Sequence, residues 1–404
     1  MRALPGDWSR PIVFCAGTAW HGNRGSDQHM AEQLARYAPV LYVDPPSWRA
    51  PCRGGTRGAR LVAVSERLAL LTPWGPPGPN RPGMRKTADA AVRWSVRRTL
   101  RALGAEPSTV VIACLDDLFG AVPGARRVLY GTDDFVAGAE LMGISESRLR
   151  RDEGHRLEEA DVVVAVSPVL ADRWRAPGRD PVLIPNGCDA ALFVGADAAP
   201  PPADIGLAPP IAGYVGHISR RIDLALLEAV ADRGRSLLLV GPAAACDTER
   251  FDALRALPNV QWVGPKPFAA LPSYLGAVDV GLVPYADTTF NRGSFPLKTL
   301  EYLAAGRPVV ATALPSIEWL ATEHVLVARS PQGYADAVDR ALSGDMSSAA
   351  VEDRRAFARA HAWEVRARDL AIALGLTDSE RLAPCFGSGR EAAAASSVRP
   401  RTVA

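Results

Sequence analysis

A segment in the last third of the sequence combines a helix start with charged residues that could hold an anion. Residues 291–312 read NRGSFPLKTLEYLAAGRPVVAT, where Pro296 stands near the first turn of the expected helix and Ser294 is its candidate N-cap. A helix N-terminus offers unpaired N–H groups and a partial positive charge to a phosphate. Lys298 lies in this turn, where a cation is unfavourable unless it serves an anionic ligand, and Glu301 follows on the same face. The two side chains could therefore hold a diphosphate and a hydroxyl of one ligand, or form a surface i,i+3 salt bridge.

The loop after the first expected strand could also approach a ligand. Residues 16–27 read AGTAWHGNRGSD, in which Gly17, Trp20 and His21 stand close together. Ligands of parallel α/β sheets bind at the carboxyl ends of strands, where glycine-rich turns expose backbone N–H groups. We interpret these residues as a ligand-contacting loop, and a flexible surface turn is the alternative.

Basic residues mark further loops. Residues 213–223 (GYVGHISRRID) turn at Gly216, after which Arg220 or Arg221 could point back at an anion or form a surface charge pair. Only three of the 46 basic residues are lysines: Lys86, Lys266 and Lys298. A lysine is a compact point charge that suits phosphate, and the last two stand at candidate loops.

Two adjacent carboxylates, Asp133 and Asp134, lie in residues 129–138 (LYGTDDFVAG). They could bind hydroxyl groups or cap local structure, and they lack the D-x-D spacing that chelates Mg²⁺ with a nucleotide. The six cysteines and six histidines are dispersed without the spacing of metal ligands. The sequence therefore predicts neither a metal site nor a disulfide framework.

Alternating apolar runs and helical stretches must position these groups. We expect strands at 12–15, 40–43, 61–64, 110–114, 128–130, 161–166 and 182–184, and a second series at 211–215, 237–240, 260–263, 280–283, 309–311 and 325–327. Helices are expected between them, for example at 29–37 and 86–103, and a last helix at 352–374. Continuous apolar strands separated by helices indicate parallel sheets that are covered on both faces.

This pattern predicts an α/β fold with two Rossmann-like parallel-sheet domains facing a cleft. The expected parts are an N-terminal domain (1–195), a proline-rich linker (196–209), a C-terminal domain (210–350), a C-terminal helix (351–377) that could return to the first domain, and a disordered tail (378–404).

The net charge of +2 over 404 residues hides an asymmetry. Residues 1–104 carry a surplus of +10, and the remainder sums to −8. The basic residues of a loop (Arg49, Arg53, Arg57, Arg60) and of the helix at 86–103 suit an anionic membrane surface or a lipid-phosphate-linked acceptor. A solvated amphipathic helix is the alternative, and no nucleic-acid partner is expected because no binding module accompanies the charge.

No apolar run reaches the roughly 18 residues of a membrane span. The first residues also lack the apolar core of a signal peptide. The expected location is therefore the cytoplasm, with peripheral contact at the inner membrane face.

Six segments in order resemble the GT-B glycosyltransferases of the group 1 (family 4) type: EEADVVVAVSPVLADRW, VLIPNGCDAALF, IAGYVGHI, LLLVGP, LPNVQWVGPKPFAALPSYLGAVDVGLVPY and SFPLKTLEYLAAGRPVVAT. The stretch WHGNRGSDQHMAEQLARYAPVLYVDPP is similar to the first βα unit of the branch with teichuronic-acid and exopolysaccharide transferases. The resemblance covers about residues 10–375.

The resemblance implies a role for several positions. Glu301 matches the second Glu of an E-x₇-E motif and would bind the donor ribose, while Gly293 stands where many members carry the first Glu. The diphosphate would meet Gly216, His217 and the backbone of Ser294, Phe295, Pro296 and Leu297. Lys298 with Arg220 or Arg221 would neutralise the leaving group, and Lys266 would lie in a loop near the base.

The resemblance implies a hexosyltransferase-type enzyme that transfers a sugar from a nucleotide-diphosphate donor to an acceptor hydroxyl. We expect retention of configuration and neither metal nor other cofactor. Acceptor-side candidates are His21 and Asp133 for catalysis and Gly17, Trp20 and Asp134 for binding. The acceptor would be a glycan, a lipid-linked sugar or a small molecule, in cell-surface polysaccharide, glycolipid or secondary-metabolite synthesis. The alternatives are a nucleotide-sugar epimerase on the same fold and a catalytically silent nucleotide-sugar-binding protein, the latter motivated by Gly293.

Overall fold

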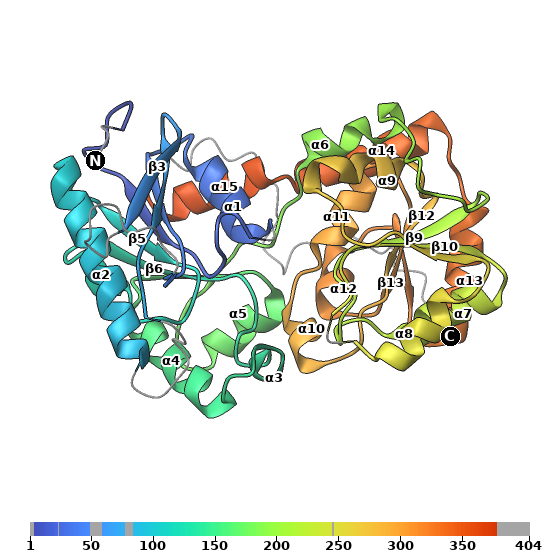
Figure 1. The fold of residues 1–404 in the computed structure, drawn as a ribbon, viewed down its shortest axis with the longest axis horizontal. Coiled ribbons are helices and arrows are strands. Elements are labelled where there is room, and N and C mark those ends of the chain that lie inside the picture. Colours follow the sequence, from blue (N-terminus) through green and yellow to red (C-terminus); the bar gives the residue numbers. More distant parts are fainter. Residues whose placement is uncertain (1–3, 23, 49–58, 77–83, 245, 378–404) are drawn as a thin grey trace. The chain divides into compact units, whose positions relative to one another are not determined.

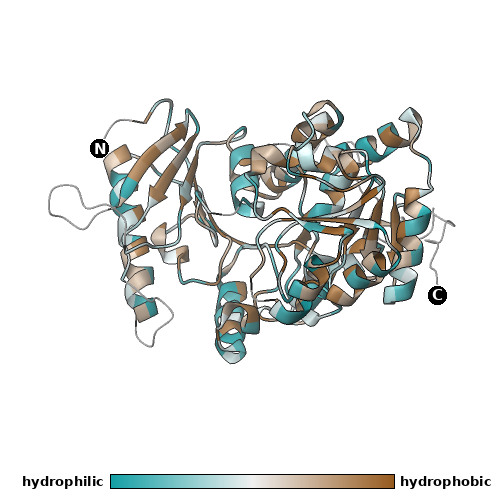
Figure 2. Cartoon of the chain, turned by 45° about the vertical axis from the view of Figure 1, so that its right-hand side comes forward, coloured by the Kyte–Doolittle hydropathy of each residue, from teal (hydrophilic) through white to brown (hydrophobic). Residues whose placement is uncertain are grey.

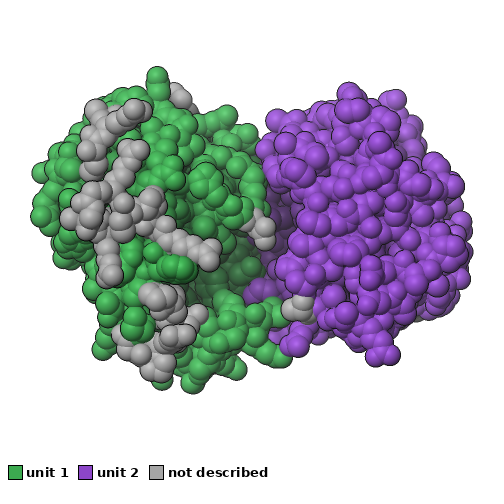
Figure 3. Space-filling model, in the orientation of Figure 1, with its two compact units in different colours: residues 1–185, 363–381 green, residues 186–362, 382–404 purple. Residues whose placement is uncertain are grey.

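The computed structural model describes residues 4–22, 24–48, 59–76, 84–244 and 246–377. It divides into two compact units (Figure 3). Unit 1 takes the described residues up to 185 and those from 363 onward, and unit 2 takes residues 186–362. Each unit holds one mainly parallel sheet with helices around it (Figure 1). The predicted α/β class with two Rossmann-like parallel sheets is confirmed.

Unit 1 is built on an eight-stranded sheet in the order β3-β4-β2-β1-β5-β6-β7-β8. Its strands are β1 (Ile12–Cys15), β2 (Val40–Val43), β3 (Arg60–Ser65), β4 (Leu68–Thr72), β5 (Thr109–Ile112), β6 (Arg126–Gly131), β7 (Val162–Ala165) and β8 (Val182–Leu183). Its helices are α1 (Ser26–Leu34), α2 (Met84–Leu103), η1 (Phe119–Ala121), α3 (Ala139–Met142), α4 (Glu146–Glu159), α5 (Pro168–Arg175) and α15 (Trp363–Ala373). Every residue of β1, β2, β5 and β7 is buried, because these apolar strands are covered on both faces.

The edge of this sheet departs from the expected parallel arrangement. β3 runs antiparallel to β4, and every one of its residues is at least partly exposed. β4, with the sequence LALLT, was not among the expected strands. A two-residue turn at Glu66 and Arg67 joins the pair, so no crossover helix is needed there.

Unit 2 is built on a six-stranded parallel sheet in the order β11-β10-β9-β12-β13-β14. Its strands are β9 (Ile211–Val215), β10 (Ser236–Val240), β11 (Val260–Trp262), β12 (Val280–Val283), β13 (Val309–Thr312) and β14 (Val325–Ala328). Its helices are α6 (Ala190–Val194), η2 (Gly195–Ala198), α7 (Leu224–Asp232), α8 (Thr248–Arg255), η3 (Phe268–Ala270), α9 (Leu271–Gly276), α10 (Thr289–Gly293), α11 (Leu297–Ala304), α12 (Pro315–Leu320), α13 (Pro331–Leu342) and α14 (Ser348–Ala360). Helices α6, α9, α11 and α14 lie on one side of this sheet, and α7, α8 and α13 lie on the other (Figure 1).

The chain passes between the units at residues 185/186 and 362/363. The sequence instead placed a linker at 196–209, but α6 and η2 pack on α9 and α11 within unit 2. The single helix expected at 352–374 is wrong, because α14 ends at Ala360 and α15 starts at Trp363. Helix α15 packs on α1 in unit 1, where the Trp363 and His29 rings stack with centroids 5.4 Å apart.

Hydrophobic residues concentrate in the strands, and the helices alternate between hydrophobic and hydrophilic faces (Figure 2). This is the distribution expected when each sheet forms the core of its unit. Among the described residues, no helix is both long and apolar enough to cross a membrane. The predicted disordered tail, as well as Arg49, Arg53 and Arg57, lies outside the described residues.

Candidate functional site

The sheet of unit 2 has a topological switch point between β9 and β12. Strand order runs toward β11 on one side of this pair and toward β14 on the other. Crossover connections therefore leave the two strands in opposite directions, and the carboxyl ends of such a strand pair are where ligands of parallel α/β sheets bind. The loops that follow β9 and β12 contain the segments 216–223 and 284–296, so the topology brings the two main sequence-predicted donor segments to one edge.

Main-chain hydrogen bonds join these two loops directly. Ala286 N donates to Arg221 O at 2.9 Å, and Asp223 N donates to Pro284 O at 2.9 Å. On the other side, Gly216 N donates to Val240 O at 2.8 Å and ties the first loop to the end of β10. Backbone hydrogen bonds thus link the loop after β9 to the loop after β12 and to the end of β10.

Helix α11 begins at this edge with open backbone donors. It starts at Leu297 after Pro296, and the N–H groups of Leu297 and Lys298 have no acceptor among the residues that the structure describes. The prediction that Ser294 caps this helix is wrong. Ser294 instead follows the last residue of α10, and its Oγ donates to Phe290 O at 2.9 Å. The donors of the first turn therefore remain available to an anion.

Lys298 and Glu301 form the i,i+3 contact that the sequence left as an alternative to ligand binding. Lys298 Nζ donates to Glu301 Oε2 at 2.8 Å. The Glu301 side chain is 9% exposed and that of Lys298 is 22% exposed. Both charges are therefore held at the helix start with limited access to water, where electrostatic interactions with a ligand are stronger than at a solvated surface.

The other predicted donor residues occupy different settings. Gly293 is buried at the end of α10. The main chain of His217 accepts a hydrogen bond from Tyr214 Oη at 3.0 Å. Lys266 Nζ lies 2.6 Å from Asp204 Oδ2, so it ties the segment before β9 to the loop after β11. Arg220 and Arg221 both lie in the loop after β9. The contacts of Arg221 are described below.

Unit 1 has its own switch point between β1 and β5. The loop after β1 contains Gly17, and a Cβ there would lie 2.7 Å from Ala113 O after β5. Only glycine permits this approach of the two loops. Trp20 stands on the same loop, where its ring packs edge-to-face with that of Tyr42 and the ring centroids are 4.9 Å apart. His21 beside it is exposed. The structure thus brings Gly17, Trp20 and His21 together.

Two buried carboxylates that the sequence analysis missed hold this loop. Asp27 Oδ2 accepts hydrogen bonds from Gly17 N, Thr18 N and Thr18 Oγ1 at 2.9–3.0 Å. Burial raises the pKa of Asp27 from 3.8 to about 6, against the opposing effect of these hydrogen bonds. Asp44 Oδ1 accepts from Trp20 N at 2.7 Å. The only sequence signal for Asp27 is an acidic residue in the first turn of α1.

Asp133 and Asp134 follow β6 but differ in their surroundings. Asp134 is buried, and its Oδ1 accepts from Ala137 N at 3.0 Å and from Arg173 Nη2 at 3.0 Å. Glu153 on α4 pairs with the same guanidinium. Asp134 therefore caps a turn and forms an ion pair, the structural role that the sequence left open, while Asp133 is partly exposed at the same edge.

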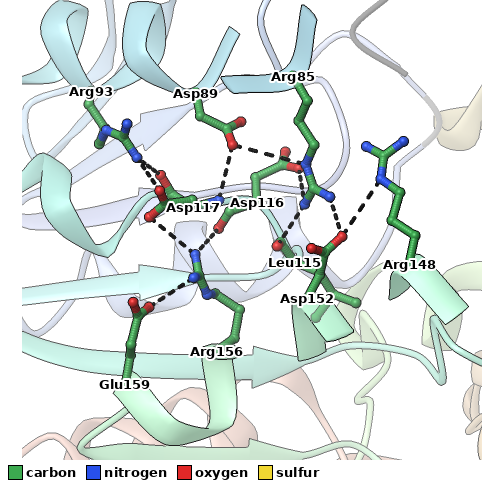
Figure 4. A network of polar contacts seen from close by, with 10 residues as sticks. All are labelled: Arg85, Asp89, Arg93, Leu115, Asp116, Asp117, Arg148, Asp152, Arg156 and Glu159. Carbon is green, nitrogen blue, oxygen red and sulfur yellow. Dashed lines mark hydrogen bonds and ion pairs between the residues drawn. The ribbon is translucent and has the colours of Figure 1, made fainter. Parts of the chain in front are cut away.

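A network of arginines and carboxylates surrounds the loop after β5 (Figure 4). Arg85 of α2 donates to Leu115 O at 2.9 Å and lies 3.1 Å from Asp116 Oδ1. Asp117 pairs with Arg93 at 2.6 Å and with Arg156 at 3.3 Å. The remaining members are Asp89, Arg148, Asp152 and Glu159. The arginines on the inner side of α2 and on α4 thus fix this loop.

The described residues contain no group of three or more His, Cys, Asp or Glu side chains placed to hold a metal ion. Burial raises the pKa of the Cys15 thiol to about 12, as expected for a cysteine that serves as a small apolar residue.

The family of glycosyl transferases group 1 matches residues 209–344, which include the whole switch-point edge of unit 2. A Bacillus subtilis protein named as a teichuronic acid biosynthesis glycosyltransferase, TuaH, is 30% identical over 267 residues, which are 62% of this chain and 67% of that protein. A D-inositol 3-phosphate glycosyltransferase of Corynebacterium urealyticum is 28% identical over 186 residues, 41% of this chain and 43% of that protein.

Solved structures share the fold at low sequence identity. Sucrose-phosphate synthase from Thermosynechococcus elongatus superposes with a TM-score of 0.70 at 20% identity, covering 90% of this chain and 98% of its own. Anabaena HepE in complex with UDP and glucose gives 0.62 at 15% identity, covering 90% and 99%. Fold, matched segment and relatives agree: the chain belongs to the group 1 glycosyltransferases and has the GT-B fold.

Proposed function

We propose that this glycosyltransferase takes a nucleoside-diphosphate sugar as its donor and binds it at the carboxyl edge of the unit 2 sheet. The observation that carries the proposal is the start of α11, where open N–H groups and the shielded Lys298–Glu301 pair meet at the β9/β12 switch point. Two similar folds support the choice of donor: HepE was solved with UDP and glucose, and an Escherichia coli trehalose-6-phosphate protein with UDP-2-fluoro glucose.

In this proposal the diphosphate accepts hydrogen bonds from the first N–H groups of α11, and Lys298 adds a positive charge. During transfer the bond between the sugar and the diphosphate breaks, so negative charge grows on the departing diphosphate oxygen. Donors that are already oriented stabilise that charge without reorganisation. Glu301, released in part from Lys298 by the phosphates, accepts hydrogen bonds from donor hydroxyl groups. We propose that transfer needs no metal, since amides and cations of the chain meet the leaving group. We also propose that it retains configuration, as the resemblance to the group 1 family implies.

The acceptor hydroxyl is proposed to bind at the carboxyl edge of unit 1. Gly17, Trp20 and His21 form one side of this edge, and Asp133 follows β6 on the same edge. His21 and Asp133 are the candidates to take the proton of the acceptor hydroxyl. The teichuronic acid assignment of the B. subtilis relative supports a cell-surface glycan as the product, and a glycolipid or secondary metabolite remains within the same chemistry.

We also propose that α2 brings the enzyme to an anionic membrane surface. Arg85, Arg93 and Arg97 are engaged with the loops of their own unit. The outward residues are Lys86, Arg98 and Arg101, together with Trp94. Trp94 is 49% exposed, and its ring centroid lies 5.1 Å from the guanidinium carbon of Arg98. Basic residues beside an exposed tryptophan suit the boundary between lipid headgroups and water.

Turnover of nucleotide sugars by two variants tests the donor site. Replacing Lys298 or Glu301 with Ala should lower turnover about a hundredfold, as for removal of one group that stabilises the transition state. The matched control is the Arg235–Asp339 pair, 2.7 Å apart at the amino edge of the same sheet, whose Ala variants should keep wild-type turnover. Unchanged turnover in Lys298→Ala and Glu301→Ala would refute the site. Conversion of the nucleotide sugar to its epimer in the absence of any acceptor would instead identify the protein as a nucleotide-sugar epimerase.

A further inference from the structure

The Asn291 side chain links the two loops of the β9/β12 switch point. Asn291 is fully buried within α10. Its Nδ2 donates to Arg221 O at 2.9 Å and to Ala286 O at 2.8 Å, and its Oδ1 accepts from Arg221 Nε at 3.0 Å. Both amide hydrogens and the carbonyl oxygen are therefore used, and they connect the loop after β9, the loop after β12 and α10.

Arg221 is oriented by these contacts while the end of its side chain stays open. Its guanidinium carbon lies 4.7 Å from the Phe290 ring centroid and 5.2 Å from that of Tyr285. Nε is taken up by Asn291. Neither terminal amino group of Arg221 has a hydrogen-bond or ion-pair partner among the residues that the structure describes. The guanidinium is thus fixed on one edge and can present two N–H donors to an anion on the other.

The chain from Asn291 to α11 is held at further points. Ser294 O accepts from Ser316 Oγ at 2.6 Å, and Phe295 O accepts from Asn186 Nδ2 at 3.1 Å. A shift at Asn291 would therefore strain the three residues before α11 instead of being absorbed by a loose loop. The carboxamide sets both the direction of Arg221 and the approach of the helix start that carries Lys298.

We propose that Asn291 is a positioning residue of the donor site: it holds Arg221 and the start of α11 in the geometry that receives the donor diphosphate. The proposal rests on the proposed function. A carboxamide suits the task because it pairs with two carbonyls and one guanidinium N–H at once, whereas Ala leaves both carbonyls and the arginine without these contacts. Misplacement of a binding group by about 1 Å can cost on the order of a hundredfold in rate.

The test compares Asn291→Ala with Asn259→Ala. Asn259 Nδ2 also bridges two carbonyls, Ala231 O at 2.8 Å and Arg235 O at 2.9 Å, but it lies before β11 at the opposite edge of the sheet. Urea unfolding should show losses of similar size for both variants. At a temperature where both are folded, Asn291→Ala should lower kcat/KM for the nucleotide sugar about tenfold to a hundredfold and weaken binding of the nucleoside diphosphate, whereas Asn259→Ala should keep both.

A second variant separates positioning from a loss of stability. Arg221→Lys keeps the positive charge and the main-chain carbonyl that receives Asn291 Nδ2, but it lacks Nε. If Asn291 acts through Arg221, adding Arg221→Lys to Asn291→Ala should lower kcat/KM by clearly less than it does in the wild type. If folded Asn291→Ala keeps the wild-type kcat/KM, or if the effects of Asn291→Ala and Arg221→Lys on kcat/KM are fully additive, the positioning role is overturned while the donor site stands. A wild-type protein that binds none of UDP, ADP and GDP overturns the proposed donor site as well.

Discussion

Replacing Asp27 with Asn should change how the stability of unit 1 depends on pH. Asp27 is buried, and its pKa of about 6 lies above the value of 3.8 for a solvated aspartate. The folded state therefore binds the proton more tightly than the unfolded state between these two values. Stability contributed by this group is present at low pH and is lost as the pH rises from about 4 to about 6.

The size of the effect follows from the shift. A difference of about two pKa units corresponds to about 3 kcal/mol when the carboxyl group is ionised in both states. Between pH 4 and pH 7 the wild type should lose about 2 kcal/mol of unfolding free energy through this group. The loss is smaller than about 3 kcal/mol because Asp27 of the unfolded chain is already partly ionised at pH 4. Asn keeps an oxygen for the Gly17 and Thr18 donors but has no charge. The unfolding free energy of Asp27→Asn should therefore rise relative to wild type by about 2 kcal/mol over this range.

Urea unfolding at several pH values, followed by tryptophan fluorescence, measures this difference. Seven of the nine tryptophans belong to unit 1, so the signal reports mainly on it. Asp161→Asn is the control, since the Arg127 guanidinium lowers the pKa of Asp161 and its stabilisation is lost as the pH falls. Its difference from wild type should change with the opposite sign. A constant difference between Asp27→Asn and wild type from pH 4 to pH 7 would refute the reasoning.

Three further changes test packing, a buried hydrogen bond and the basic surface. Gly281→Ala would place a Cβ 2.2 Å from the Tyr302 ring and should cost at least about 1–3 kcal/mol in urea unfolding. Gly154→Ala meets no atom within 4 Å inside α4 and should instead stabilise by about 0.5–1 kcal/mol. Tyr302→Phe removes the Oη that accepts from buried Val215 N at 2.7 Å and should cost about 1–3 kcal/mol by the same assay; no loss would show that water replaces the hydroxyl. The double variant Trp94→Ala, Arg98→Ala should sediment less than wild type with anionic vesicles at moderate salt, with neutral vesicles as the control, and equal sedimentation would exclude this face of α2.

The sequence was most informative where a local pattern decides the structure. Apolar runs such as IVFC at 12–15 predicted buried parallel strands, because few other elements bury four consecutive residues on both faces. β4 escaped prediction because its Leu- and Ala-rich run fits a helix as well as a strand. The break between α14 and α15 also escaped, since residues around His361 show no proline or glycine that would end a helix.

The candidate site was less accessible to prediction because its contacts join distant residues. Lys298 and Glu301 were found from their spacing on one helix. Asn291 and Arg221 are 70 positions apart, and only the neighbouring places of β9 and β12 bring them together. Ser294 was misassigned because a serine two residues before a proline fits the start of α11 as well as the end of α10.

Titration of the protein with UDP, ADP and GDP in a calorimeter tests the donor site most directly. Wild type should bind at least one of these nucleotides. Lys298→Ala and Glu301→Ala should bind it at least about tenfold more weakly, because each loses a charged contact worth about 1.5–3 kcal/mol. The Arg235→Ala control should bind like wild type. Equal affinity in all four proteins, or no binding by wild type, would contradict the assignment of the donor site to the start of α11.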